Sequence, residues 1–207
     1  MLKIYGFPTF NLNKVLFTAE EIGLEYEYVA LDPTKNEHKT LEHIQRQPLG
    51  KIPAIEHNDK AIFESAAICR YLANVGGKLY NGDAMQRAAV DQWMDLIAHH
   101  AGRWLGVLFF EEYIKTKLMN MPANEAAIKE AKGFLDQQLP AIDKHLQHNE
   151  FFAGDTITIA DTFGLAYFHT HEVTSIDFSS YPNITRWYSQ MKQRPSFTKA
   201  LRHFQNN

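Results

Sequence analysis

One segment of the chain, residues 38–72, concentrates the side chains most able to bind a charged ligand. It reads HKTLEHIQRQPLGKIPAIEHNDKAIFESAAICRYL and combines a basic turn, an Ile-Pro step, a tight hairpin and Glu64-Ser65 at an expected helix start. Unpaired N–H groups and the positive end of the helix dipole favour a carboxylate at such a start, and the Ser65 hydroxyl adds a donor. The segment therefore predicts a cradle for a small peptide with a carboxylate at each end. A plain N-cap role for Ser65 is the alternative.

The elements that must hold these residues follow one order along the first third of the chain. Apolar spacing and turn residues predict a strand, a helix and a strand, and then a short helix, two strands and a helix. Their ranges are 2–6, 11–23, 26–31, 39–45, 53–57, 60–63 and 65–75. A strand–helix–strand unit with so short a connection is parallel and right-handed. This order is the thioredoxin-like pattern.

After Gly82 the pattern becomes helical, and no further strand is convincing. Helical spacing covers 84–118, 124–148, 159–173, 182–193 and 196–204. We therefore expect two domains, residues 1–77 and 84–207, the first α/β and the second all-α. Within the second domain, Thr158 and Asp161 form an acidic capping box, to which we assign a structural role and no chemistry.

The composition limits the classes of protein to which the chain can belong. It has 207 residues, 45 % hydrophobic and 22 % charged, as is typical of a soluble globular protein. A formal net charge of -3 without a long basic run gives no support for nucleic-acid binding. The start MLKIYGF does not fit a signal peptide, and no apolar run is long enough for a membrane span. The single cysteine, Cys69, excludes an internal disulfide, indicates a cytoplasmic protein and is interpreted as a buried apolar residue.

Several histidines outside residue 38 are assigned no binding role. They comprise the pairs His99-His100 and His169/His171 and the isolated residues His43 and His57. Neighbours one or two positions apart on a helix do not share a face, and neither pair has a third ligand at suitable spacing. We therefore expect no metal. The two isolated histidines are interpreted as solvated side chains.

Five motifs together resemble the glutathione S-transferase family, in its serine-type branch, and are most similar to the phi class. They are YGFPTFNLNKV, EHKTLEHIQRQPLGKIPAI, IFESAAICRYL, FFAGDTITIAD and WYSQMKQRPSF, and they cover nearly the whole chain. The resemblance implies the cytosolic glutathione transferase architecture, an α/β thioredoxin-like N-terminal domain plus an all-α C-terminal domain. It also implies a detoxifying cytoplasmic enzyme that forms a homodimer, with Leu49 as an apolar key into the partner subunit.

The resemblance places glutathione in the cradle, with its cysteinyl unit against the Ile-Pro step. In the family this proline is cis, which turns the backbone N–H and C=O of Ile52 toward the ligand, like an added strand. The alternative is that Pro53 only begins a strand, and the sequence looks identical in both cases.

The two ends of glutathione are assigned by the same resemblance. The γ-glutamyl carboxylate docks at Ser65, and Glu64 faces the amino group beside it. His38 and Lys39 lie near the glycyl carboxylate. Lys51 adds positive charge at that end, although the phi class often has glutamine at its position.

The resemblance also makes Thr9 the catalytic position. Only roughly 3 % of a thiol with a pKa near 8.5 is ionised at pH 7, and a hydroxyl that donates to sulfur at a helix start favours the thiolate. The phi class has serine here, whereas threonine adds a methyl group and restricts χ1. Some bacterial glutathione-binding relatives pair threonine with a following asparagine, which makes Asn11 a second donor. The alternative is that Thr9 or Asn11 only caps the first helix.

The second substrate is expected between the domains, in an electrophile pocket lined by Phe10, Trp104 and Leu108. Aromatic residues at helical spacing are more often core residues, which is the alternative here. The apolar character of these side chains implies small hydrophobic electrophiles, attacked by the glutathione thiolate. Glutathione is a co-substrate in this hypothesis, and no cofactor is bound permanently.

Other functions use the same fold and stay open at this point. A glutathione-dependent peroxidase or disulfide reductase would use the same bound thiol. A non-catalytic member would bind a hydrophobic ligand or a protein partner, because fold does not determine function. An enzyme that activates the bound thiol differs from a non-catalytic member in the role of Thr9. In the enzyme Thr9 lowers the pKa of the bound thiol, and in the non-catalytic member it only caps a helix.

Overall fold

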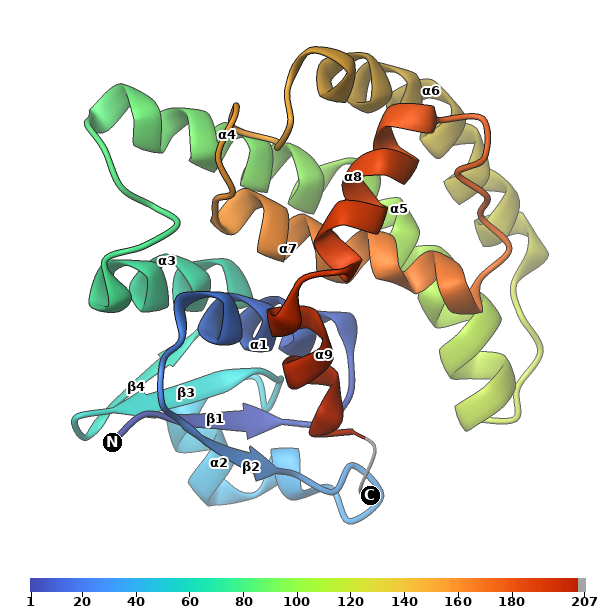
Figure 1. The fold of residues 1–207 in the computed structure, drawn as a ribbon. Helices are drawn as coiled ribbons and strands as arrows, with labels where there is room; N and C mark the ends of the chain where they lie inside the picture. The colour runs from blue at the N-terminus through green and yellow to red at the C-terminus, as the bar shows by residue number, and fades with distance from the viewer. Residues whose placement is uncertain (205–207) are drawn as a thin grey trace. The chain divides into compact units, whose positions relative to one another are not determined.

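The computed structural model of the chain describes residues 1–204, which form two compact units (Figure 1). The first unit contains Met1–Asn81 and the C-terminal segment that begins at Arg194. The second unit contains Gly82–Gln193. The sequence placed 84–207 in one helical domain, so the two divisions differ at the C-terminal end. Residues 205–207 of that expected domain lie outside the described residues.

The first unit contains a four-stranded sheet. Its strands are β1 (Lys3–Gly6), β2 (Glu27–Ala30), β3 (Ala54–His57) and β4 (Lys60–Phe63), in the spatial order β2-β1-β3-β4. β1 pairs in parallel with β2 and antiparallel with β3, and β3 pairs antiparallel with β4. This mixed sheet confirms the thioredoxin-like fold that the order of elements predicts.

Helices complete the first unit. They are α1 (Phe10–Ile22), the 3-10 helix η1 (Glu37–Lys39), α2 (Leu41–Arg46), α3 (Ser65–Gly76) and α9 (Pro195–Arg202). α1 begins after Thr9, whose hydroxyl oxygen accepts the Leu12 N–H at 3.3 Å, and ends at Gly23, whose φ of 82° suits glycine. α1 packs against α3. Fully buried side chains from the sheet and these helices form the core, among them Ile4, Leu12, Leu16, Ile55, Ile68 and Leu72.

The last helix, α9, belongs to the first unit because it packs against α1. The Glu21 carboxylate accepts hydrogen bonds from the Arg194 guanidinium (Nε–Oε2 2.9 Å) and from the Ser196 hydroxyl. The rings of Phe17 and Phe197 stack with their centroids 5.2 Å apart. Helical periodicity detected α9, but it carried no information about which unit the helix joins.

The second unit is helical, as the sequence predicts. Its elements are α4 (Ala84–His99), α5 (Ala101–Leu108), the π-helix η2 (Phe109–Leu118), α6 (Glu125–His148), α7 (Ile159–Phe168), the 3-10 helix η3 (His169–Val173) and α8 (Pro182–Lys192). The single pattern expected over 84–118 divides at His100, whose φ and ψ of -116° and -103° are not helical. No helix within residues 1–204 is long and apolar enough to cross a membrane.

Asp161 anchors the second unit through a carboxylate that is completely buried. The expected capping box with Thr158 is present at the start of α7. One carboxylate oxygen also accepts the backbone N–H of Phe152 at 2.9 Å and the indole N–H of Trp187 at 3.0 Å. Asp161 therefore joins three segments, and the partnership with Trp187 had no signal in the local sequence.

We expect Asp161→Ala to lower the free energy of unfolding by at least about 3 kcal/mol, because it leaves several buried N–H donors without an acceptor. Thr158→Ala removes only the reciprocal half of the box and should cost about 1 kcal/mol. Urea denaturation of both variants and the wild type measures the difference. Equal losses in the two variants would contradict a role for Asp161 beyond the helix cap.

The hydrogen bonds of Glu21 with Arg194 and Ser196 predict that the attachment of α9 is sensitive to acid. Burial raises the pKa of Glu21, but the hydrogen bonds from Arg194 and Ser196 hold that pKa below its ordinary value of 4.5. A carboxyl whose pKa is lowered by folding stabilises the protein fully above its unfolded pKa, and this stabilisation is lost as the pH falls through the folded pKa. Between about pH 6 and about pH 3.5, the free energy of unfolding should therefore fall more steeply in the wild type than in Glu21→Gln. If the free energy of unfolding, measured by urea denaturation, falls equally with pH in both proteins, the Glu21 hydrogen bonds contribute nothing to stability.

Candidate functional site

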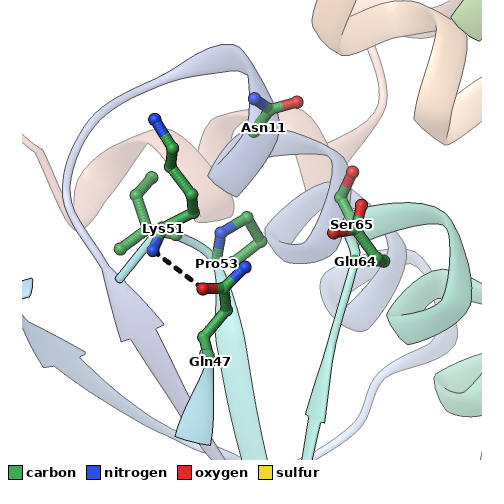
Figure 2. A pocket seen from close by; sticks show the side chains of 7 residues that line it. Asn11, Gln47, Lys51, Pro53, Glu64 and Ser65 are labelled. Carbon is green, nitrogen blue, oxygen red and sulfur yellow. Dashed lines mark hydrogen bonds between the residues drawn. The ribbon is translucent and has the colours of Figure 1, made fainter. Parts of the chain in front are cut away.

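A pocket on the first unit gathers six of the nine residues that were expected to bind glutathione or its sulfur (Figure 2). Its volume of about 320 Å³ lies within the range of small-molecule sites. The lining residues are Asn11, Gln47, Lys51, Ile52, Pro53, Glu64 and Ser65. All of them except Gln47 belong to the expected set.

The sheet brings three separate segments to this pocket. Ala54, the first residue of β3, pairs with Tyr5 of β1 on one side and with Phe63 of β4 on the other. Because β3 runs antiparallel to both neighbours, β1 and β4 end at the edge where β3 begins. The start of α1, the Ile52-Pro53 step and the start of α3 therefore meet at one edge of the sheet.

The start of α3 forms one wall of the pocket. Glu64 has φ 69° and ψ 113°, a conformation that a residue with a side chain rarely adopts, and which costs of the order of 1–3 kcal/mol. Ser65 follows as the first residue of the helix and lines the pocket. The unpaired N–H groups of a first helical turn attract an anion, so this wall suits a carboxylate.

A turn that precedes β3 forms the opposite wall, and buried side chains of the preceding segment hold it. The Gln47 side-chain oxygen accepts the backbone N–H groups of Leu49 at 2.7 Å and Lys51 at 3.0 Å (Figure 2 shows the second bond). The His43 ring nitrogen Nε2 lies 2.7 Å from the Lys51 carbonyl oxygen. The backbone of this wall is therefore fixed before any ligand binds.

His38 and Lys39 lie beside this turn, and neither is among the residues in the described chain that line the pocket. The Lys39 ammonium donates to the carbonyls of Leu49 at 3.1 Å and Gly50 at 2.9 Å. Gly50 has φ +57°, and a Cβ there would lie 2.8 Å from the His38 carbonyl oxygen, so glycine is required. The His38 ring meets Phe7 edge-on, and burial lowers the pKa of His38. Direct contacts of His38 and Lys39 with a ligand stay a prediction.

The peptide bond between Ile52 and Pro53 is cis, the form that the resemblance implied. Pro53 is buried and Ile52 is half-buried. Both line the pocket directly before β3 begins at Ala54.

The start of α1 contributes Thr9 and Asn11. Thr9 caps α1, so the capping alternative holds, but a hydroxyl that accepts one hydrogen bond keeps its O–H as a donor. Thr9 is half-buried, and only Asn11 of the two lines the pocket. The Asn11 side-chain oxygen accepts a hydrogen bond from the ammonium of Lys14 at 2.7 Å. The two residues therefore supply two candidate donors at one helix start.

The residues expected at the electrophile lie in both units. Phe10 is the first residue of α1, with the Lys14 ammonium 5.1 Å from its ring centroid. Trp104 and Leu108 belong to α5 of the second unit, where Trp104 stacks on Phe134 with centroids 4.3 Å apart. Their shared role in binding an electrophile stays a prediction.

Two residues that support the site were misread or missed in the sequence. The interpretation of His43 as a solvated side chain is wrong, because it is fully buried against the backbone of Lys51. Gln47, at 2 % exposed, was not singled out. The available signal was their spacing: His43 is on α2, and Gln47, four residues later, is the residue that caps the end of that helix. His57 is also engaged, with its Nδ1 2.8 Å from the Tyr71 hydroxyl.

The chemistry of the pocket is that of polar donors and backbone groups. Within residues 1–204, no three His, Cys, Asp or Glu side chains lie where they could hold a metal ion. Burial raises the pKa of the Cys69 thiol to about 11, so this cysteine is not a nucleophile at neutral pH. The pocket can therefore hold a ligand with anionic groups and stabilise a negative charge beside Asn11.

Comparison with known proteins gives evidence that is independent of the geometry of the site. Residues 1–74 match the family model for the glutathione S-transferase N-terminal domain, and residues 107–195 match the model for the C-terminal domain. The chain is 31 % identical over 206 residues to probable glutathione S-transferase GSTF2 of Oryza sativa subsp. japonica, covering 96 % of this chain and 95 % of that protein.

Solved structures agree over the full length of the chain. The crystal structure of glutathione transferase F2 from Populus trichocarpa has a TM-score of 0.95 and 28 % identity, with complete coverage of both chains. A structure of glutathione S-transferase-I bound with lactoylglutathione has a TM-score of 0.89 and 28 % identity, covering 96 % of this chain and 97 % of that one. Motifs, fold, family models and relatives therefore coincide, and the chain belongs to the glutathione S-transferase family, with relatives in its phi class.

Proposed function

We propose that the pocket binds glutathione and that the protein conjugates the glutathione thiolate to hydrophobic electrophiles. The observation that carries this proposal is that the first turns of α1 and α3, through Asn11 and Ser65, open on one cavity beside the Ile52-Pro53 step. A glutathione derivative, lactoylglutathione, occupies a relative of nearly the same fold. Family membership and site geometry thus support the same reaction.

Glutathione is oriented by its two carboxylates. The γ-glutamyl carboxylate takes the wall formed by Ser65 and the first N–H groups of α3, and its amino group faces the exposed Glu64 carboxylate. The cysteinyl unit pairs with the backbone of Ile52. The glycyl carboxylate lies toward Lys51, with Lys39 supplying positive charge from behind the turn and His38, whose pKa burial lowers, as a neutral ring beside it.

The sulfur then lies at the start of α1. There the Thr9 hydroxyl and the Asn11 amide are the donors that favour the thiolate, together with the positive end of the helix dipole. The thiol proton leaves to solvent, and the thiolate attacks the electrophilic carbon to form a C–S bond, while the electron pair moves to the leaving group or the acceptor. Glutathione is a co-substrate in this scheme, with no cofactor bound permanently.

The second substrate is proposed to be a small hydrophobic electrophile, and Phe10, Trp104 and Leu108 are the residues assigned to it. Detoxification in the cytoplasm is the corresponding biological role. A homodimer is also proposed. The support for it is Leu49, which precedes the glycine of the rigid turn and is 69 % exposed, as an apolar key into a partner subunit would be.

The thiol pKa of bound glutathione tests the proposed chemistry directly. We expect ultraviolet thiolate absorbance to give a value about 2 below that of the free thiol, equal to ~2.7 kcal/mol of preference for the anion. Thr9→Val and Asn11→Ala should each raise this pKa by about 1 if both donate to sulfur. An unshifted pKa in the wild type would contradict the transferase mechanism and favour a non-catalytic binding protein. A lowered pKa without conjugation of a model electrophile would favour the disulfide reductase or peroxidase alternative.

Ser65 tests the orientation of glutathione. Ser65→Ala removes a hydrogen bond to a charged group, worth about 1.5–3 kcal/mol, and should weaken glutathione binding by at least about 10-fold. The bound thiol pKa should stay low because sulfur lies at the other helix start. Calorimetric titration measures the affinity, with Ser189→Ala, an exposed serine on α8, as the matched control. Unchanged affinity in Ser65→Ala would place the γ-glutamyl carboxylate elsewhere.

A further inference from the structure

A buried lysine lies directly behind the proposed thiolate donor. Lys14 is on α1, three residues after Asn11, and is only 2 % exposed. Lysine is almost never fully buried unless its charge is partnered. The ammonium donates to the Asn11 side-chain oxygen at 2.7 Å and lies 5.1 Å from the Phe10 ring centroid. No part of the mechanism described so far uses this residue.

The chemistry of the two groups fixes the direction of the Asn11 amide. An ammonium has three donors and no acceptor, so only the oxygen of the amide can face Lys14. The amide is planar, and its nitrogen therefore points away from Lys14. Figure 2 shows the Asn11 nitrogen on the side of Lys51 and the oxygen on the opposite side. The N–H donors of Asn11 thus lie on its Lys51 side, and Asn11 and Lys51 both line the pocket.

The surroundings of Lys14 make its hydrogen bond to Asn11 sensitive to charge in the pocket. Burial lowers the pKa of Lys14 to about 7, and the opposing effects of Cys69 and Glu64 favour the charged form. Burial keeps the Cys69 thiol neutral at this pH, so Glu64 is the anion of the two. A thiolate formed near Asn11 would add a second negative charge, which also favours the ammonium. The ammonium in turn holds the amide in the orientation that donates to sulfur.

We propose that Lys14 is a positioning residue, which fixes the Asn11 side-chain amide so that its N–H groups point at the sulfur of bound glutathione. The inference rests on the proposed function, because it needs glutathione in the pocket. A lysine that acted only through its charge would also favour the thiolate, but that effect would not depend on Asn11. This difference makes the inference testable.

A double-mutant cycle separates the two roles. The four proteins are the wild type, Lys14→Met, Asn11→Ala and the double variant, and the readouts are the bound thiol pKa and the affinity for glutathione. We expect Lys14→Met to raise the bound thiol pKa by about 1 in the wild-type background and to leave it unchanged in the Asn11→Ala background. The affinity measured well below the bound thiol pKa, where glutathione binds with its thiol protonated, should change little, because the peptide is held by other residues.

Two control variants, Lys14→Arg and Lys129→Met, accompany the cycle. Lys14→Arg keeps a cation that can only donate, so it should retain most of the lowered pKa. Lys129→Met removes one positive charge from the exposed face of α6 and should change nothing. An equal rise on Lys14→Met with and without Asn11 would overturn the inference in favour of a charge effect, and no rise in either background would overturn it outright.

A measurement on the wild type covers the case in which Lys14→Met does not fold. The Asn11 side-chain N–H resonances should move downfield on binding glutathione above the bound thiol pKa, and not on binding S-methylglutathione, which has no thiolate. Equal changes with both ligands would overturn the inference. If the wild type binds no glutathione, or leaves the thiol pKa unshifted, the proposed function itself fails. If the wild type lowers that pKa but the cycle is additive, only the inference fails.

Discussion

The candidate site depends on the backbone pairing of one residue, Ala54. Its pairing with Tyr5 and Phe63 sets the register of the three strands whose ends carry the pocket. Side chains alternate between the faces of a sheet, so a slip of one residue would turn the apolar face of β3 away from the core. The fully buried Ile55, beside Ala54, prevents such a slip. Core packing therefore determines where the helix starts and the Ile-Pro step meet, and the ligand groups follow from that position.

The groups proposed to donate to the sulfur, Thr9 and Asn11, are both neutral. Lys14 is buried behind Asn11, whereas Lys51 and Glu64 are exposed at the rim of the pocket. Hydroxyl and amide donors stabilise a thiolate strongly, because hydrogen bonds to a charged acceptor are stronger than neutral ones. A thioether sulfur is only a weak acceptor, so the same donors lose most of their hold once the C–S bond has formed. Such a site favours the nucleophile over the product.

Much of the fold could be predicted from local sequence signals, whereas most residues of the pocket were assigned by the resemblance of several motifs to a known family. Strand alternation, helix caps and the Ile-Pro step each act within a few residues, and the helix start at Glu64-Ser65 was visible as a short motif. Long-range partners had no such signal. Trp187 reaches the Asp161 carboxylate across 26 positions, and Arg194 reaches Glu21 across 173. Burial also reversed one local interpretation, since His43 has the polarity of a solvated residue but serves the backbone of the turn inside the protein.

The position of α9 has a consequence for synthesis of the protein. The second unit is a continuous stretch of chain inserted between the two parts of the first. A ribosome therefore completes Gly82–Gln193 before it makes the helix that covers Phe17 and Glu21 on α1. The unit that is translated first is the last to be finished. Until then, the nascent chain presents an apolar ring and an unpaired carboxylate on a surface that the mature protein closes.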